Sequence, residues 1–212
     1  DIDNAYAYLH KGIVRTSLAL LRSLVNFQWN ECSGRVQVVL KRKKDPFDTY
    51  TYMMPVFRQY GITPVFFFLV GKYTRYDKNV SIKNSSFRKL IQMTEKEAQI
   101  GLHPSYSSNN DSRYLEKEYQ NLYRVVQKEI TRSRQHFIKL LFPQTYRRLI
   151  ALGIKEDYSM GYPSDVGFRA GTCSPFPFFD IEKDTQTTLM IYPFQAMDQT
   201  LNKYLQLSPE EA

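Results

Sequence analysis

The chain has 212 residues but only two cysteines, Cys32 and Cys173, nine glycines, one tryptophan and no long hydrophobic run. Two cysteines cannot build the disulfide framework of a small secreted domain, which favours a reducing compartment and buried thiols. The apolar run Val65–Val70 stops after six residues, whereas a membrane-spanning helix needs about 20. The low cysteine content and the lack of a long hydrophobic run exclude a disulfide-stabilised scaffold and indicate a globular domain with a hydrophobic core.

Hydrophobic residues make up 42% of the chain, aromatic residues 15% and charged residues 24%. This composition excludes wholesale disorder, and the length is enough to bury a sizeable core. Neither a repeat nor an internal boundary is apparent, so we expect one domain over residues 1–212. The 29 Lys and Arg residues outnumber the 21 Asp and Glu residues, giving a net charge of +8. Such an excess favours acidic partners, including anionic polymers, phosphates and membrane surfaces.

Both ends of the sequence have features that are expected of a fragment of a longer chain. The first residue is Asp1 rather than an initiator Met, and no signal peptide follows it. At the other end, Leu207–Ala212 has the pattern of a helix start, with Ser208 as N-cap and acidic residues in the first turn. We therefore expect a strand before Asp1 and at least one helix and one strand after Ala212.

Hydrophobic periodicity predicts helices that alternate with short apolar strands. The loop Gly161–Phe179 is rich in Gly and Pro and is predicted to have no regular structure. This alternation is typical of an α/β fold with a mostly parallel sheet, either open or closed into a barrel. The expected helices are Ile13–Trp29, a helix capped by Asp48 or Thr49 that runs to Tyr60, Ser85–Ala98, Asp111–Arg132 and Pro143–Leu152; the expected strands are Thr63–Val70, Ile100–His103, Gln135–Lys139, Tyr158–Met160 and Thr188–Tyr192.

Two of the three histidines, His103 and His136, lie in or beside predicted strands, and Asp1 and Asp3 open the chain. Sites in α/β folds are built at the carboxyl ends of strands. One carboxylate and two imidazoles suit Zn²⁺ or a similar divalent ion, and a second carboxylate can take a proton from water. The alternative is structural: a single His at a strand end more often makes a hydrogen bond, and Asp-x-Asp is common in loops.

Five segments taken in order resemble the polysaccharide deacetylase (NodB-homology, carbohydrate esterase family 4-like) superfamily. The resemblance covers almost the whole chain and is closest to a divergent branch associated with bacterial surface-polysaccharide biosynthesis. The last three segments in combination are more specific than the first. The segments are Asp1-Ile2-Asp3, Gly101-Leu102-His103-Pro104-Ser105-Tyr106, Arg134-Gln135-His136-Phe137, Asp157-Tyr158-Ser159-Met160-Gly161-Tyr162 and Gly167-Phe168-Arg169-Ala170-Gly171-Thr172.

The resemblance implies a distorted (β/α) barrel of about seven mostly parallel strands, incomplete at both ends of this chain. It implies a hydrolase that removes N- or O-linked acetyl groups from a sugar or polysaccharide in capsule or O-antigen biosynthesis. The implied cofactor is one divalent metal ion, with zinc first and cobalt, nickel or manganese as alternatives. The implied location is the cytoplasm, at the inner face of the membrane.

The resemblance also implies roles for individual residues. Asp1 matches the catalytic base, and Asp3 and His103 match metal ligands. The family usually has a second His four residues after the first, but this sequence has Ser107 there. His136 is the candidate replacement ligand.

Two arginines complete the implied site. Arg134 would orient the base through a charge-assisted hydrogen bond, and Arg169 would do the same or bind an anionic sugar. The family's Leu-x-His segment, which supplies the catalytic acid, has no counterpart before Ala212 and is expected beyond it. The expected substrate-binding residues are Ser105, Tyr106, Ser107, Tyr162 and Phe168.

Ser107 and the missing acid segment leave an alternative function, a non-catalytic relative that binds a glycan or a protein partner. The basic run Lys41–Lys44 also has several explanations. It can be a solvated face, part of a peripheral contact with an anionic membrane, or a surface that packs on a neighbouring domain. Nucleic acid is not an expected partner, because no recognition motif accompanies the basic charge.

Overall fold

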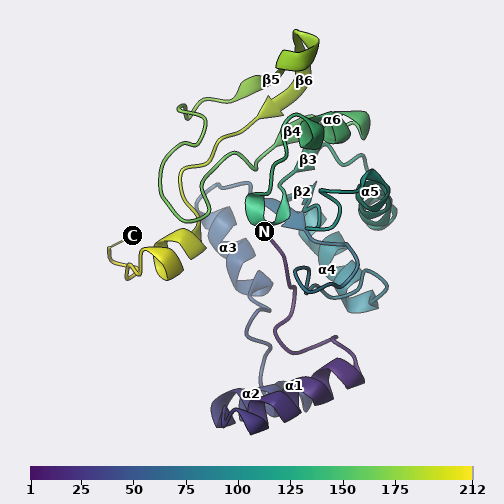
Figure 1. The fold of residues 1–212 in the computed structure, drawn as a ribbon. Coiled ribbons are helices and arrows are strands. Elements are labelled where there is room, and N and C mark those ends of the chain that lie inside the picture. The colour runs from purple at the N-terminus through teal and green to yellow at the C-terminus, as the bar shows by residue number, and fades with distance from the viewer. Residues whose placement is uncertain (212) are drawn as a thin grey trace.

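The computed structural model describes residues 1–211 and contains a six-stranded sheet in the order β1-β2-β3-β4-β6-β5 (Figure 1). Every pairing in it is parallel except that between β5 and β6. Ile2 extends the sheet by a parallel bridge to Phe68 at the outer edge of β1. The strands are β1 (Val65–Phe68), β2 (Gln99–Leu102), β3 (Arg132–Ser133), β4 (Glu156–Asp157), β5 (Phe176–Asp180) and β6 (Thr185–Ile191).

Strand β1 forms where the sequence predicts a strand that is covered on both faces. Phe66, Phe67 and Phe68 of β1 are all buried, as expected for a strand inside a parallel sheet. Gly101 of β2 lies opposite Phe67, and a Cβ at this position would come within 2.4 Å of that ring. Only glycine therefore allows these two strands to pair with the Phe67 ring in place.

Four helices pack around this sheet, and two of them begin at a side-chain cap. The Asn84 side chain accepts from the Phe87 N–H to start α4, and the Asp111 side chain accepts from the Arg113 N–H to start α5. Such caps satisfy N–H groups that have no partner within the helix. The helices are α3 (Tyr50–Gln59), α4 (Ser85–Glu95), α5 (Ser112–Val126) and α6 (Gln144–Ala151).

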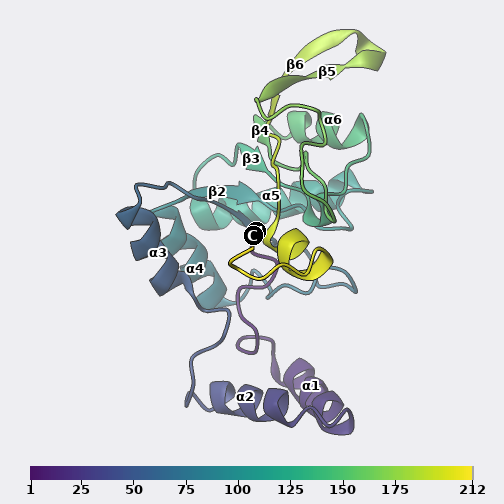
Figure 2. The ribbon, with the colours of Figure 1, turned by 90° about the vertical axis from the view of Figure 1, so that its left-hand side faces the viewer.

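The remaining two long helices form an antiparallel hairpin set apart from the sheet. These are α1 (Ile13–Val25) and α2 (Trp29–Val39). Both views place this hairpin at the opposite end of the molecule from the β5–β6 hairpin (Figures 1 and 2). Among the described residues, no helix is long and apolar enough to cross a bilayer.

The α/β class with a mostly parallel sheet is confirmed, but the sheet is open within residues 1–211, so the closed barrel is not confirmed. The predicted strand Gln135–Lys139 is wrong, because β3 ends at Ser133 and His136–Ile138 is a 3₁₀ turn. The predicted loop Gly161–Phe179 is wrong at its end, where β5 begins, and Cys173 is exposed rather than buried.

Other boundaries also shift. The helix predicted to reach Arg132 ends at Val126, where Gln127 adopts a left-handed conformation that breaks it. The hydrophobic periodicity did not predict α2, because polar and apolar residues are intermixed along this helix and make it only weakly amphipathic. Ser208–Glu211 forms a turn in which the Glu211 carboxylate accepts from the Ser208 N–H at 2.9 Å. Ala212 lies outside the described residues.

Candidate metal centre

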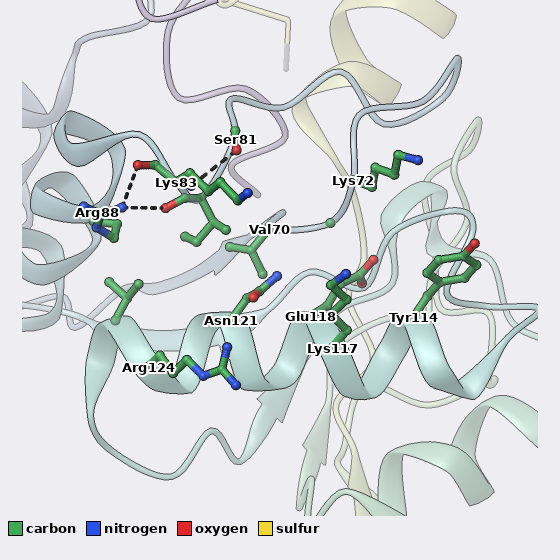
Figure 3. A pocket seen from close by; sticks show the side chains of 13 residues that line it. Val70, Lys72, Ser81, Lys83, Arg88, Tyr114, Lys117, Glu118, Asn121 and Arg124 are labelled. Carbon is green, nitrogen blue, oxygen red and sulfur yellow. Dashed lines mark hydrogen bonds between the residues drawn. The ribbon is translucent and has the colours of Figure 1, made fainter.

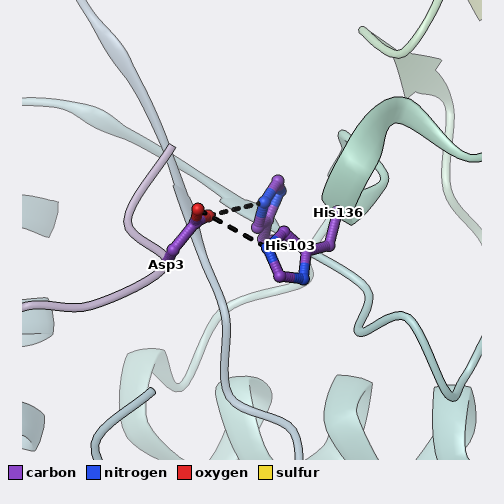
Figure 4. A group of neighbouring side chains, drawn as sticks. All are labelled: Asp3, His103 and His136. Carbon is purple, nitrogen blue, oxygen red and sulfur yellow. Dashed lines mark ion pairs between the residues drawn. The ribbon is translucent and has the colours of Figure 1, made fainter. Parts of the chain in front are cut away.

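Three predicted ligands meet at the carboxyl edge of the parallel sheet. Asp3 follows the bridged residue Ile2, His103 follows β2, and His136 lies in the turn after β3. His103 Nε2 lies 3.0 Å from Asp3 Oδ1, and His136 Nε2 lies 3.5 Å from Asp3 Oδ2 (Figure 4). One ligand atom from each residue can be chosen so that all lie within 4.8 Å of one another. The topology of a parallel sheet explains this convergence, because successive strands end at one edge.

Each imidazole is held by its second nitrogen. His103 Nδ1 donates to the Arg134 carbonyl oxygen at 2.6 Å, and His136 Nδ1 lies 2.9 Å from Asp77 Oδ1. A carbonyl oxygen only accepts, so His103 Nδ1 carries a proton, and Nε2 is the nitrogen that faces Asp3. Partners of this kind fix the tautomer and orientation of histidines that bind metals.

Asp77 contacts the cluster through His136, a contribution that the sequence did not reveal. It is fully buried in the loop between β1 and α4. Besides His136, its carboxylate accepts from the Tyr106 N–H and from Thr74 Oγ1, both at 2.8 Å. The spacing Thr74-x-x-Asp77 hints at a local turn, but nothing in the sequence indicates that it faces His136, 59 residues away.

The electrostatics of the three residues are coupled. Burial by itself raises the pKa of Asp3, but hydrogen bonds from His103 and His136 outweigh it and keep that pKa far below its usual range. Burial lowers the pKa of His103, which favours the neutral imidazole. Burial also opposes the charge on His136, yet the Asp3 and Asp77 carboxylates raise its pKa to about 9. The two carboxylates therefore concentrate negative charge on a site that attracts a cation.

The second carboxylate of the Asp-x-Asp pair lies beside this cluster. Asp1 Oδ2 is 3.3 Å from Arg134 Nε, and Asp1 Oδ1 is 4.0 Å from His103 Nδ1. The Arg134 guanidinium lies 4.2 Å above the Phe194 ring. That ring occupies the space beside Gly161, where a Cβ would come within 2.2 Å of it. Gly161 thus allows Phe194 to support the arginine that faces Asp1.

A buried network under the site holds the turn that carries Arg134 and His136. Asp157 Oδ2 accepts from Ser133 Oγ at 2.7 Å and from Ser159 Oγ at 3.0 Å. Ser159 Oγ in turn accepts from the Gln135 N–H at 2.9 Å. Burial raises the pKa of Asp157 to about 6, against the opposing effect of these hydrogen bonds and of Arg134. The network joins the ends of β3 and β4 directly below the cluster.

Two open cavities flank Asp1 and Asp3, with volumes of about 470 Å³ and 810 Å³. The first also contains His103 and His136, and the second contains Arg134. The C-terminal segment 196–204 lines both, a contribution that the sequence did not reveal. Its lining residues are Ala196, Met197, Asp198, Gln199, Asn202, Lys203 and Tyr204.

In the described part of the chain, none of the five predicted substrate-binding residues is among the residues that line the two cavities at the cluster. Ser105 is buried, and its N–H donates to Glu118, whereas Tyr106 stacks on Tyr76 with the ring centroids 4.3 Å apart. Tyr76 lines the smaller cavity, so Tyr106 supports its wall. Within residues 1–211, neither Ser107 nor the loop residues Tyr162, Phe168 and Arg169 line the two cavities at the cluster.

Glu118 of α5 reaches a separate cavity of about 470 Å³ that is surrounded by basic residues (Figure 3). Its carboxylate accepts from the Ser105 N–H at 3.0 Å and so anchors the loop that follows His103. Burial raises the pKa of Glu118 to about 7, although hydrogen bonds from Ser105 and Ser108 oppose the shift. The basic residues around it are Lys72, Lys83, Arg88, Lys117 and Arg124.

The Glu118→Gln variant should change how stability depends on pH. The folded pKa is raised above the unfolded value of 4.5, so the protonated carboxyl stabilises the fold at low pH and this contribution is lost as pH rises through about 7. We expect the free energy of unfolding of the unmodified protein to fall relative to the variant by about 3 kcal/mol over this range. Denaturant unfolding across pH measures this difference. The exposed neighbour Glu116→Gln is the matched control, and a Glu118→Gln difference that is flat with pH would contradict the assignment.

Comparison with protein-family models and with curated proteins finds no match. Among solved structures, one that matches is from Mycobacterium smegmatis and is described as a "putative polysaccharide deacetylase". The similarity is 13% sequence identity with a TM-score of 0.45, over 65% of this chain and 42% of that chain. The chain thus spans less than half the length of that protein, and a match this distant establishes neither the family nor the activity.

Proposed function

We propose that this chain is a metal-dependent hydrolase that removes acetyl groups from a sugar or polysaccharide. The observation that carries the proposal is the cluster of Asp3, His103 and His136 at the carboxyl edge of the sheet, with its ligand atoms within 4.8 Å. A second carboxylate, Asp1, lies beside it and is paired with Arg134. This arrangement combines a three-ligand site with a base, which is what hydrolysis of an amide or ester needs.

The donor set fits a divalent cation. Asp3, His103 and His136 would hold it through one carboxylate oxygen and two Nε2 atoms, a combination that zinc accepts and that also suits cobalt, nickel or manganese. When bound, such an ion supplies Lewis-acid polarisation of a carbonyl and lowers the pKa of a water. The fixed Nδ1 partners of both histidines are typical of metal sites, and the open cavity leaves room for substrate.

The protein's own residues would handle the proton. Asp1 accepts a proton from the attacking water as general base, because its carboxylate lies beside the cluster, with Oδ1 4.0 Å from His103 Nδ1. The proton then passes to the sugar amine or alkoxide that is released when the acyl C–N or C–O bond breaks. The Arg134 guanidinium pairs with Asp1 and fixes the orientation of its carboxylate. Phe194 below the guanidinium limits the rotamers that Arg134 can adopt.

The walls of the smaller cavity support a sugar as substrate. Tyr76, Phe137 and Tyr204 line it and supply aromatic rings, a side-chain type on which sugar rings can stack. Arg75, Lys78 and Lys203 also line it and would favour an anionic glycan. The motifs that resemble polysaccharide deacetylases support an acetyl group as the acyl unit that is transferred to water, with the sugar amine or hydroxyl as the leaving group. They also support bacterial surface-glycan biosynthesis in the cytoplasm as the setting. Arg169 is exposed and remains a prediction for contact with a larger substrate.

Acetate release tests this function. The full chain is incubated with N-acetylated oligosaccharides and, separately, with O-acetylated ones, as purified, after chelation, and after zinc is restored. We expect release that chelation abolishes and zinc restores. Metal content measured on the same samples separates metal binding from hydrolysis, the two parts of the proposal. Bound zinc without release would favour a glycan-binding module, whereas release that chelation does not affect would exclude the proposed mechanism.

A further inference from the structure

The helical hairpin α1–α2 exposes its apolar side to solvent. Ile13 is 86% exposed, Leu21 is 58% exposed and Val25 is 67% exposed, and Val14, Leu18 and Leu24 continue the same stripe. These residues recur at helical spacing, so they lie on one face of α1. The opposite face, which packs toward α2, has small residues, and Ser23 there is only 3% exposed. The helix is therefore amphipathic with its apolar face turned outward.

The hairpin tip and the second helix add to this surface. Phe27 is 77% exposed at the tip, and Trp29, the only tryptophan of the chain, is 61% exposed. Their rings meet edge to face with centroids 6.3 Å apart. Val36 and Leu40 continue an exposed stripe along α2 from Trp29. Tryptophan at an apolar surface is typical of segments that lie at a membrane interface.

Almost all of the net charge of the protein lies in residues 11–44, which comprise the hairpin and the short segments that flank it. Residues 11–44 contain eight Lys and Arg residues and a single acid, Glu31, and so hold seven of the eight net positive charges. Arg22 lies near the tip and the run Lys41–Lys44 follows the end of α2, all of them exposed. Basic residues that flank an apolar stripe match a surface that is both anionic and apolar. A second copy of the hairpin would instead bring two strongly positive surfaces together.

We propose that the α1–α2 hairpin docks this protein on an anionic lipid bilayer. α1 has 13 residues and is about 20 Å long, whereas the hydrocarbon core is about 30 Å thick, so the hairpin lies in the interface rather than crossing it. Docking does not depend on the proposed hydrolase activity.

The two segments that flank the hairpin are joined to each other, and Arg15 of α1 contacts the loop that follows β1. Asp45 accepts from the N–H groups of Ala7, Tyr8 and Leu9 at 2.7–2.9 Å. Arg15 of α1 donates to the Lys78 carbonyl oxygen at 2.8 Å, next to Asp77. Phe47, just beyond the hairpin, lines the larger cavity at the metal cluster. The segment that follows the hairpin therefore connects it to the wall of this cavity.

Vesicle binding tests the proposal, with Trp29 as the built-in reporter. The full chain is mixed with vesicles of phosphatidylcholine plus phosphatidylglycerol, and with vesicles of phosphatidylcholine alone. We expect flotation with the anionic vesicles, a blue shift of tryptophan emission, and weakening of both by salt. Leu21→Glu should weaken binding by about tenfold or more, and each neutralised lysine of the Lys41–Lys44 run by about fivefold.

Ile181→Glu is the matched control, because Ile181 is 85% exposed on the distant β5–β6 hairpin and should leave vesicle binding unchanged. Circular dichroism melting checks that each variant folds. Absence of binding to anionic vesicles would overturn the proposal, and so would binding that Leu21→Glu leaves intact. A dimer in light scattering that Leu21→Glu dissociates, without lipid binding, would identify the apolar face as a contact between copies.

Discussion

The His103→Ala variant should lose high-affinity zinc binding, and acetate release with it. His103 presents Nε2 to Asp3 at 3.0 Å and is fixed by the Arg134 carbonyl oxygen. Removing only a partner that orients a metal ligand lowers metal affinity by about 10–100-fold, so removing the ligand itself should cost more than about 100-fold. Zinc titration by calorimetry measures the affinity, and metal analysis after gel filtration measures the stoichiometry.

The matched control is His10→Ala. His10 packs edge to face on Tyr6 and lies outside the cluster, so this variant should bind zinc as the unmodified protein does. Because His103 and His136 are both buried, His136→Ala serves as a second ligand variant in a different packing environment, and the folding of both variants is checked. Unaltered zinc binding in both ligand variants, with both folded, would refute the metal centre whatever the activity proves to be.

The Asp1→Asn variant should retain zinc but lose most of the acetate release. Asparagine keeps the size of the side chain and can still face Arg134, but it cannot accept a proton from water. General-base catalysis contributes about 10²–10⁴-fold, so we expect a fall in turnover number within this range and little change in metal affinity. Steady-state kinetics and zinc titration on the same preparation give both values.

Asp198→Asn is the matched control for this prediction. Asp198 lies in the C-terminal segment and lines the larger cavity, and its negative charge acts on Arg134. It does not belong to the cluster of Asp3, His103 and His136. Its replacement should lower turnover far less than Asp1→Asn does. An equal loss in both variants would indicate that the charge around Arg134 matters, rather than a proton accepted by Asp1.

Local pattern predicted the elements that carry the site. The buried run of β1, the end of the predicted strand Ile100–His103 and the start of the helix at Asp111 all depend on neighbouring residues, whose preferences are visible in the sequence. His136 was correctly grouped with Asp3 and His103. The segment that contains it, however, was predicted to be a strand and is a 3₁₀ turn. The segment turns sharply at Phe137, which adopts a left-handed conformation that no local signal anticipates.

The sequence by itself determined the alternation of helices and strands, the excess of basic residues and the polar side chains that follow apolar runs. These properties arise within a few residues, through helix caps, side-chain periodicity and composition. Only the tertiary structure decided that Asp77 holds His136, that Phe194 supports Arg134, and that the 196–204 segment lines the cavities. It also decided that the apolar face of α1 points outward. Contacts of this kind join residues far apart in the chain, and their stability comes from burial and charge pairing that exist only once the sheet has assembled.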